Sequence, residues 1–140
     1  MFLAFKIVLS SFLCLHLTLL WASSDNWVHV VDRGGNTVFY DAKSVSNSDG
    51  ILSVKWVSNS AEGNRLRVGS GYLNKKSMLY SSRFECKSKS FIVDRAVWFD
   101  SEFAIGQGHT NARTGMGWQN PESRHYEKNL NVEILNKLCK

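Results

Sequence analysis

Hydrophobic and polar residues alternate along much of the chain after residue 25, which is the pattern of β-strands with one buried face. Residues 26–33 and 36–42 flank a Gly-Gly pair, and two glycines between β-rich runs predict a hairpin because both can take a positive φ. Residues 46–50 carry Asp-Gly at their tip and predict a second turn. The alternation then resumes over residues 51–59, which we expect to form another strand of the same sheet.

Two further strands follow, and less regular segments lie around them. Residues 76–86 alternate, and residues 90–100 carry apolar side chains on both faces, which indicates a central strand. Residues 58–74 are rich in Ser, Asn and Gly and predict a loop or an irregular edge strand. Residues 102–106 are expected to add a short strand, and the polar residues 107–115 to form a mobile loop.

The C-terminal segment changes from the period of a strand to that of a helix. Leu130, Ile134 and Leu138 lie four residues apart and form one apolar stripe. Pro121, the only proline, ends strand pairing because it has no N–H, so "WQNPES" predicts a joint between sheet and helix, with Trp118 buried there. The expected fold class is α+β: a single antiparallel β-sheet of about five to seven strands with a C-terminal α-helix.

The first 24 residues differ from the rest of the chain. One cation, Lys6, precedes an apolar run over residues 7–21, and three small residues follow at 22–24. This layout predicts a signal peptide at residues 1–24 and a mature domain at residues 25–140, with an uncleaved N-terminal anchor as the alternative. The apolar run is shorter than the roughly 20 residues that a membrane span needs, so no transmembrane segment is expected after cleavage.

The mature domain keeps two cysteines, Cys86 and Cys139. Export and an even number of cysteines predict a disulfide bond, with two separate buried thiols as the alternative. The bond would fasten the helix to a strand of the sheet. On the chain-entropy model, closing a loop of this length contributes about 4 kcal/mol to stability.

The charge of the mature domain indicates which partners it favours. Removing the signal peptide removes only Lys6, so 16 cations remain against 12 anions, a net charge of +4. This value favours a protein or an anionic surface ligand as partner, and it is far below the charge of a dedicated nucleic-acid binder. The candidate contact surface consists of the segment from Arg65 to Lys76 and the loop from Gly106 to Gly115. Its cationic or titratable side chains are Arg65, Arg67, Lys75, Lys76, His109 and Arg113. The alternative is that both segments are ordinary solvated loops.

No catalytic constellation is evident in the sequence. His29, His109 and His125 lack the spacing of a zinc site, and no serine stands in a G-x-S-x-G elbow. A disulfide would remove both thiols as nucleophiles. We therefore expect no catalytic residues, no metal and no cofactor, which favours a non-enzymatic binding protein. A small hydrolase with His109 as its base is the enzymatic alternative.

The order of several short motifs resembles a known family, the surface-adhesin protein E family of small exported bacterial proteins. Each motif alone is weak, and the resemblance rests on their order over nearly all of the mature domain: Trp27, "VFYDAKSV" (38–45), "VKW" (54–56), Cys86, "WFD" (98–100), W-x-x-P-x-S (118–123) and Cys139.

The resemblance implies a single sheet with a disulfide-tied C-terminal helix, and it allows a homodimer. It implies a binding role, because the founding member attaches to host extracellular-matrix proteins such as laminin or vitronectin. That member resembles a lipoprotein, whereas a lipobox is absent here, so both the periplasm and the outer cell surface stay open as locations. The alternative functions are a periplasmic inhibitor or immunity-type protein acting on a lysozyme-like enzyme or toxin, and a structural envelope component.

Overall fold

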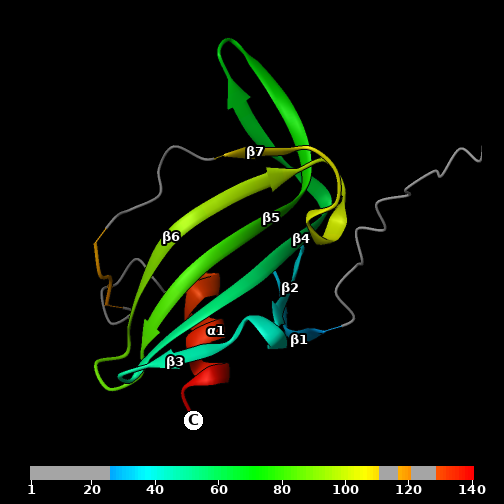
Figure 1. Ribbon diagram of the computed structural model, residues 1–140. Helices are drawn as coiled ribbons and strands as arrows, with labels where there is room; N and C mark the ends of the chain where they lie inside the picture. Colours follow the sequence, from blue (N-terminus) through cyan, green and yellow to red (C-terminus); the bar gives the residue numbers. More distant parts are fainter. Residues whose placement is uncertain (1–25, 111–116, 121–128) are drawn as a thin grey trace, which may run out of the picture.

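The computed structural model describes residues 26–110, 117–120 and 129–140. The predicted signal peptide, Pro121, His125 and Arg113 lie outside these ranges. The described residues form one seven-stranded antiparallel sheet and one C-terminal α-helix, which confirms the expected fold class (Figure 1). The elements are β1 (Trp27–Arg33), β2 (Asn36–Asp41), η1 (Ala42–Ser44), β3 (Ser46–Ser48), β4 (Ile51–Val68), β5 (Gly71–Glu85), β6 (Ser90–Phe99), η2 (Glu102–Ala104), β7 (Gly108–Thr110) and α1 (Leu130–Leu138).

The two predicted turns at the start of the sheet are confirmed. β1 and β2 pair across Gly34 and Gly35, whose φ angles are 58° and 76°. β3 and β4 pair across Asp49 and Gly50, which also have positive φ. The sheet order is β1-β2-β4-β5-β6-β7, with β3 paired to β4 beside β2.

β4 and β5 are much longer than the sequence predicts. They have 18 and 15 residues and remain paired, across an irregularity between Asn59 and Asn64, as far as Val68 opposite Gly71. Of the two alternatives predicted for residues 58–74, the loop was therefore wrong, whereas an irregular edge strand describes the part of β4 beyond Ser60. The pairing needs only backbone N–H and C=O groups, and both faces of the ribbon's far end lie in solvent. A polar composition is therefore compatible with a strand at this place.

A β-bulge interrupts the pairing of β5 with β6. Ser81 lies opposite Arg95 while Ser82 lies opposite Val93, which leaves Asp94 as the extra residue. A bulge of this kind shifts the alternation by one position, so the core-facing row runs from Phe91 before the bulge to Ala96 after it. The regular alternation of a strand, which would place Phe91 and Ala96 on opposite faces, therefore does not hold along β6.

The segments that follow β6 also differ from the sequence prediction. Residues Glu102–Ala104 form a 3-10 turn, η2, where a strand was expected. Part of the predicted loop forms β7, which pairs with the end of β6 through Gly108 opposite Phe99. Trp118 is 46% exposed and so is not buried as predicted, although its neighbour Gln119 forms a β-bridge with Phe91.

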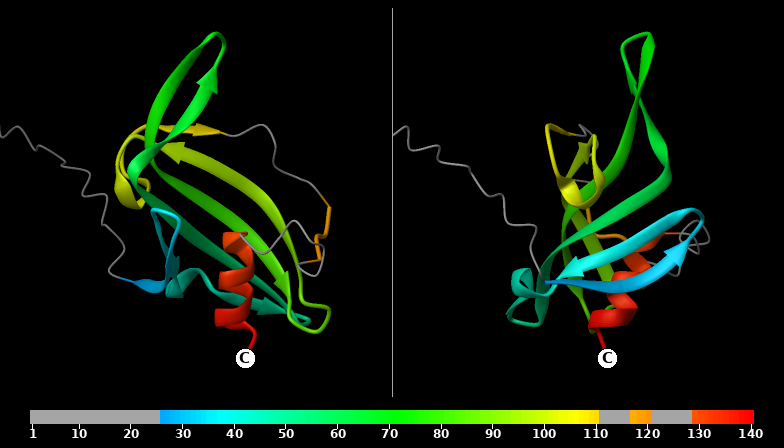
Figure 2. Two further views of the ribbon diagram at one scale, coloured as in Figure 1. Left: turned by 180° about the vertical axis from the view of Figure 1, so that it is seen from behind. Right: turned by 90° about the vertical axis from the view of Figure 1, so that its right-hand side faces the viewer.

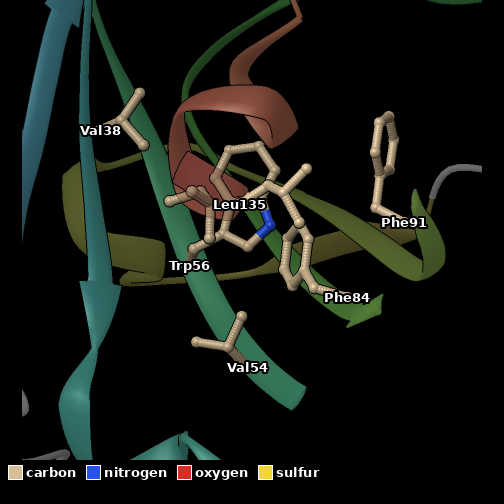
Figure 3. Packing of buried hydrophobic residues seen from close by; sticks show 7 residues of the cluster. Val38, Val54, Trp56, Phe84, Phe91 and Leu135 are labelled. Carbon is tan, nitrogen blue, oxygen red and sulfur yellow. The ribbon is translucent and has the colours of Figure 1, made fainter. Parts of the chain in front are cut away.

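The main core lies between one face of the sheet and α1 (Figure 3). Asn129 caps the helix by accepting from the N–H of Asn131, and Ile134 and Leu135 project from the helix onto the sheet. Trp56 belongs to the same buried cluster as Leu135, and its ring stacks on that of Tyr80 with centroids 3.9 Å apart. The buried cluster consists of Val38, Val54, Trp56, Phe84, Phe91, Ile134 and Leu135.

The predicted disulfide is present. Cys86 follows β5 directly, Cys139 follows α1 directly, and their Cα atoms are 5.2 Å apart. An ion pair between Arg33 and Glu133 connects the β1–β2 hairpin to the same helix. Among the described residues, no helix has the length and apolar character required to cross a membrane.

Candidate binding surface

A long two-stranded extension projects from the sheet. Pairing with β2 ends at Ser60 on one side, and pairing with β6 ends at Ser77 on the other. We call residues 61–76 the arm: its strands pair with each other from Asn64 opposite Lys75 to Val68 opposite Gly71, and at its base the N–H of Ala61 donates to the carbonyl of Gly35. Figures 1 and 2 show the arm, in green, reaching well beyond the other strands at the end of the sheet opposite α1.

The strand register divides the side chains of the arm between two faces. Arg65 lies opposite Asn74 and Arg67 opposite Tyr72, so these four side chains share one face, which we call the cationic face. The other face carries the apolar residues Leu66, Val68 and Leu73. The two faces therefore offer different chemistry to a partner.

An aromatic side chain organises the cationic face. The guanidinium carbon of Arg65 lies 5.7 Å from the centroid of the Tyr72 ring, which is within the range of a cation–π contact. Tyr72 is 63% exposed, and Arg67 donates from Nε to the carbonyl of Gly69 at the tip of the arm. These contacts hold two guanidinium groups on the same exposed face.

A concave surface accompanies these residues on the arm. A hollow of about 530 Å³ is lined by Glu62, Gly63, Arg65, Tyr72, Leu73 and Asn74. Gly63 has a φ of +80°, and a Cβ there would lie 2.1 Å from Oδ1 of Asn74. The left-handed backbone favours glycine here, and a larger residue would also displace the Asn74 side chain.

The base of the arm is fixed to the rest of the sheet by Lys75 and Lys76. The Lys75 side chain is only 2% exposed and forms an ion pair with Asp100, which follows β6. This ammonium group holds the pKa of the Asp100 carboxyl below its ordinary value, first through the hydrogen bond and then through charge attraction. Lys76 donates from Nζ to the carbonyl of Ala61 across the arm.

The structure separates the predicted contact residues into different groups. Arg65 and Arg67 lie exposed on the arm, as an interaction surface requires. Lys75 does not belong to such a surface, because its ion pair with Asp100 places it in the interior. His109 lies half-buried on β7, and Arg113 lies outside the described residues.

Sequence reasoning missed Tyr72, the aromatic partner of Arg65. Tyr72 can be identified only from the hairpin register, which places residues 65 and 72 on the same face. Because the segment was predicted as a loop, no register was assigned to it. Reading Gly69-Ser70-Gly71 as the tip of a hairpin would have provided that register.

A second exposed aromatic group lies at the other end of the sheet. Arg83 donates to both carboxylate oxygens of Asp94, from Nε at 2.8 Å and from Nη2 at 2.7 Å. This pairing raises the pKa of Arg83 above its ordinary value. The guanidinium also lies 5.8 Å from the ring centroid of Trp118, so its charge is already engaged on two sides.

Metal ligands do not gather anywhere in the parts of the chain that the structure describes. No group of three or more His, Cys, Asp or Glu side chains there could hold an ion. We therefore take the arm as the candidate site, because Arg65 and Arg67 share one exposed face of it and Arg65 contacts the ring of Tyr72.

Comparisons with known proteins agree with this architecture. A family model described as surface-adhesin protein E matches residues 27–140. The chain is similar to a crystal structure of protein E from non-typeable Haemophilus influenzae, at 14% identity and a TM-score of 0.55, covering 74% of this chain and 72% of that one. It is also similar to crystal form II of Haemophilus influenzae protein E, at 13% identity and a TM-score of 0.56, covering 81% and 88%. No curated protein sequence matches the chain.

Proposed function

Because the chain belongs to the surface-adhesin protein E family, we propose that it is an exported, non-enzymatic binding protein whose arm contacts an anionic partner. Host extracellular-matrix proteins are the partners proposed for testing. The family description, which names a surface adhesin, supports this reading. The observation that carries it is the projecting arm with its cationic face.

The position of the arm supports a role in contact. It extends past the neighbouring strands, so a large partner can approach it without meeting the body of the sheet. Tyrosine and arginine are among the residues that contribute most to binding at protein interfaces, because both provide large contact areas and directed polar groups. Tyr72, Arg65 and Arg67 supply this combination on one face.

The charge of the arm determines which sign of charge its partner should carry. The arm carries three cations besides Lys75, namely Arg65, Arg67 and Lys76, and one carboxylate, Glu62, while the charge of Lys75 is compensated by Asp100. A positive surface accelerates encounters with an anionic partner and makes the association sensitive to salt. A strongly basic target such as a lysozyme-like enzyme would be repelled by the same surface.

Export is part of the proposal. The first 24 residues have the pattern of a signal peptide, and a disulfide bond persists in an oxidising compartment. Both features favour a location outside the cytoplasm, in the periplasm or at the outer surface. Proteolysis of intact cells distinguishes the two, because only a protein displayed at the surface is cleaved.

The test is a binding assay with immobilised laminin, vitronectin and heparin, measured at two salt concentrations. The test variant is R65Q/R67Q, and the matched control is K87Q/K89Q, which removes the same charge from the exposed turn before β6. We expect R65Q/R67Q to weaken binding by about fivefold to thirtyfold, from two contacts of about 0.5–1 kcal/mol each. The control should bind like the parent protein.

The outcomes separate the proposed surface from a general effect of charge. Equal loss in both variants would show that net charge alone drives binding, and unchanged binding in R65Q/R67Q would reject the arm as the contact surface. Circular dichroism of each variant checks that the sheet is intact. Inhibition of a lysozyme-like enzyme in the absence of matrix binding would favour the alternative function.

A further inference from the structure

A cluster of aromatic rings lies on the face of the sheet opposite α1. Val38 and Trp56 face the helix, so their strand neighbours Phe39 and Val57 face the other way. Phe39 packs against Phe103 of η2 with ring centroids 5.1 Å apart. Trp27 packs against Phe103 and His29 against Phe39, so two further rings support the central pair.

The loop that presents Phe103 is held in an unfavourable conformation. Phe103 and the following Ala104 have φ angles of 55° and 59°, a region that residues other than glycine seldom adopt. Two buried side chains of the sheet stabilise it, because Asn59 accepts from the N–H of Phe103 and Ser77 accepts from that of Ala104. Strain that is maintained by dedicated buried partners is characteristic of functional sites.

A small hollow lies beside these rings at the base of the arm. It has a volume of about 160 Å³ and is lined by Thr37, Phe39, Asn59, Ala61, Glu102 and Phe103. The volume is below the 300–1,000 Å³ range typical of pockets for drug-sized ligands, so it admits only a small group or the end of a larger molecule. Glu102 is the only charged side chain among the described residues that line it, and it is exposed.

The chemistry of these walls selects the charge of the ligand. Aromatic rings carry negative electrostatic potential on their faces and attract cations, and a carboxylate at the rim adds to that attraction. The residues that line the hollow include no lysine or arginine, and the nearby ammonium group of Lys76 is engaged by the carbonyl of Ala61. We propose that this hollow is a binding site for a quaternary ammonium group such as that of choline, held by Phe39, Phe103 and Glu102.

The proposed site does not depend on the proposed function of the arm. The arm presents guanidinium groups to an anionic partner, whereas the hollow presents rings and a carboxylate to a cation. No residue of the arm's cationic face lines the hollow. Failure of one proposal therefore leaves the other standing.

The test uses the full-length, disulfide-bonded protein and choline as the probe, followed by NMR of the Phe103 and Ala104 backbone amides. The control ligand is 3,3-dimethylbutan-1-ol, which has the shape of choline with carbon in place of the charged nitrogen. We expect choline to shift both amides and to bind at least about fivefold more tightly than the neutral alcohol, the effect of one cation–π contact. Titration with phosphatidylcholine vesicles then shows whether the group is also accepted on a lipid surface.

Two matched variants test whether choline binds at this hollow. E102Q removes the carboxylate at the rim and should weaken choline binding by about threefold. E62Q makes the same change at a residue of the arm that does not line this hollow, and it should leave the affinity unchanged. Equal binding of choline and the neutral alcohol, equal effects of the two variants, or no saturable amide shift up to about 100 mM choline would overturn the proposal.

Discussion

Replacement of Ser82 by alanine tests how the centre of the sheet is connected to the helix. The Ser82 hydroxyl accepts from Nε1 of Trp56 at 3.0 Å and donates to Oδ1 of Asn131 on α1 at 3.3 Å. All three side chains are at least 94% buried, so water does not replace a lost partner. One small hydroxyl thus satisfies an indole donor on β4 and an amide acceptor on the helix.

The expected cost follows from the two groups that lose their partner. A buried polar group left without a hydrogen bond costs about 1–3 kcal/mol. Asn131 is held in place by its own bond to Asn129, so it cannot easily turn toward a new donor. We expect S82A to lower the free energy of unfolding by about 2–6 kcal/mol, a large part of the stability of a domain of this size.

The assay is equilibrium unfolding in urea with the disulfide intact, followed by tryptophan fluorescence and circular dichroism. S81A is the matched control, because Ser81 is the neighbouring residue on the opposite face of the same strand. A double-mutant cycle of S82A with W56F isolates the hydrogen bond from the volume change. The reasoning is refuted if S82A costs no more than S81A, or if the coupling energy with W56F is near zero.

Three further predictions concern the disulfide and two ionisable groups. Replacing Cys86 and Cys139 by serine should lower the free energy of unfolding by about 4 kcal/mol, measured in urea, and a loss below about 1 kcal/mol would contradict the loop-closure account. The ammonium group of Lys75 lowers the pKa of Asp100 in the folded protein. The contribution of Asp100 to stability is therefore complete above the unfolded-state pKa of about 4, and it is lost as the pH falls through the lower pKa of the folded state. D100N should therefore reduce the loss of stability in acid, measured by urea unfolding at acid and at neutral pH, and an unchanged loss would contradict the role of Lys75. Burial raises the pKa of Tyr80 to about 12, so stability should fall as the pH rises above the unfolded-state pKa of about 10, and Y80F should remove the phenolate titration near that raised pKa, followed by absorbance.

The parts of the fold that depend on local pattern could be predicted from the sequence. Two glycines are sufficient for the β1–β2 turn, because positive φ angles exclude most other residues there. The helix follows from the spacing of Leu130, Ile134 and Leu138, and the disulfide follows from the two cysteines that remain once the predicted signal peptide is removed.

The parts that depend on long-range pairing were not accessible in the same way. The bulge at Asp94 is fixed by the strand opposite it, so the switch of the buried row leaves no mark in the sequence of β6 itself. Alternation in the arm is confined to a few residues near its tip, and the Ser, Asn and Gly residues on either side of them make the segment look like a loop. Lys75 looks like any other surface lysine until Asp100 is placed beside it.

The candidate sites show the same division. Arg65 and Arg67 could be selected from their charge alone, whereas Tyr72 acquires its role only through the hairpin register. The hollow at Phe103 combines residues from β2, β4 and η2, and it exists only because a turn folds back over the sheet. No short segment of the sequence contains all the residues that line it.

Because no other strand covers the arm near its tip, its length could change without disturbing the rest of the sheet. Inserting two residues into each of its strands would extend the tip by about 7 Å and return every later side chain to its original side. Inserting a single residue into each strand would instead exchange the guanidinium side and the aliphatic side. Related chains can therefore differ in span by even steps while they keep the same chemistry directed toward whatever they touch.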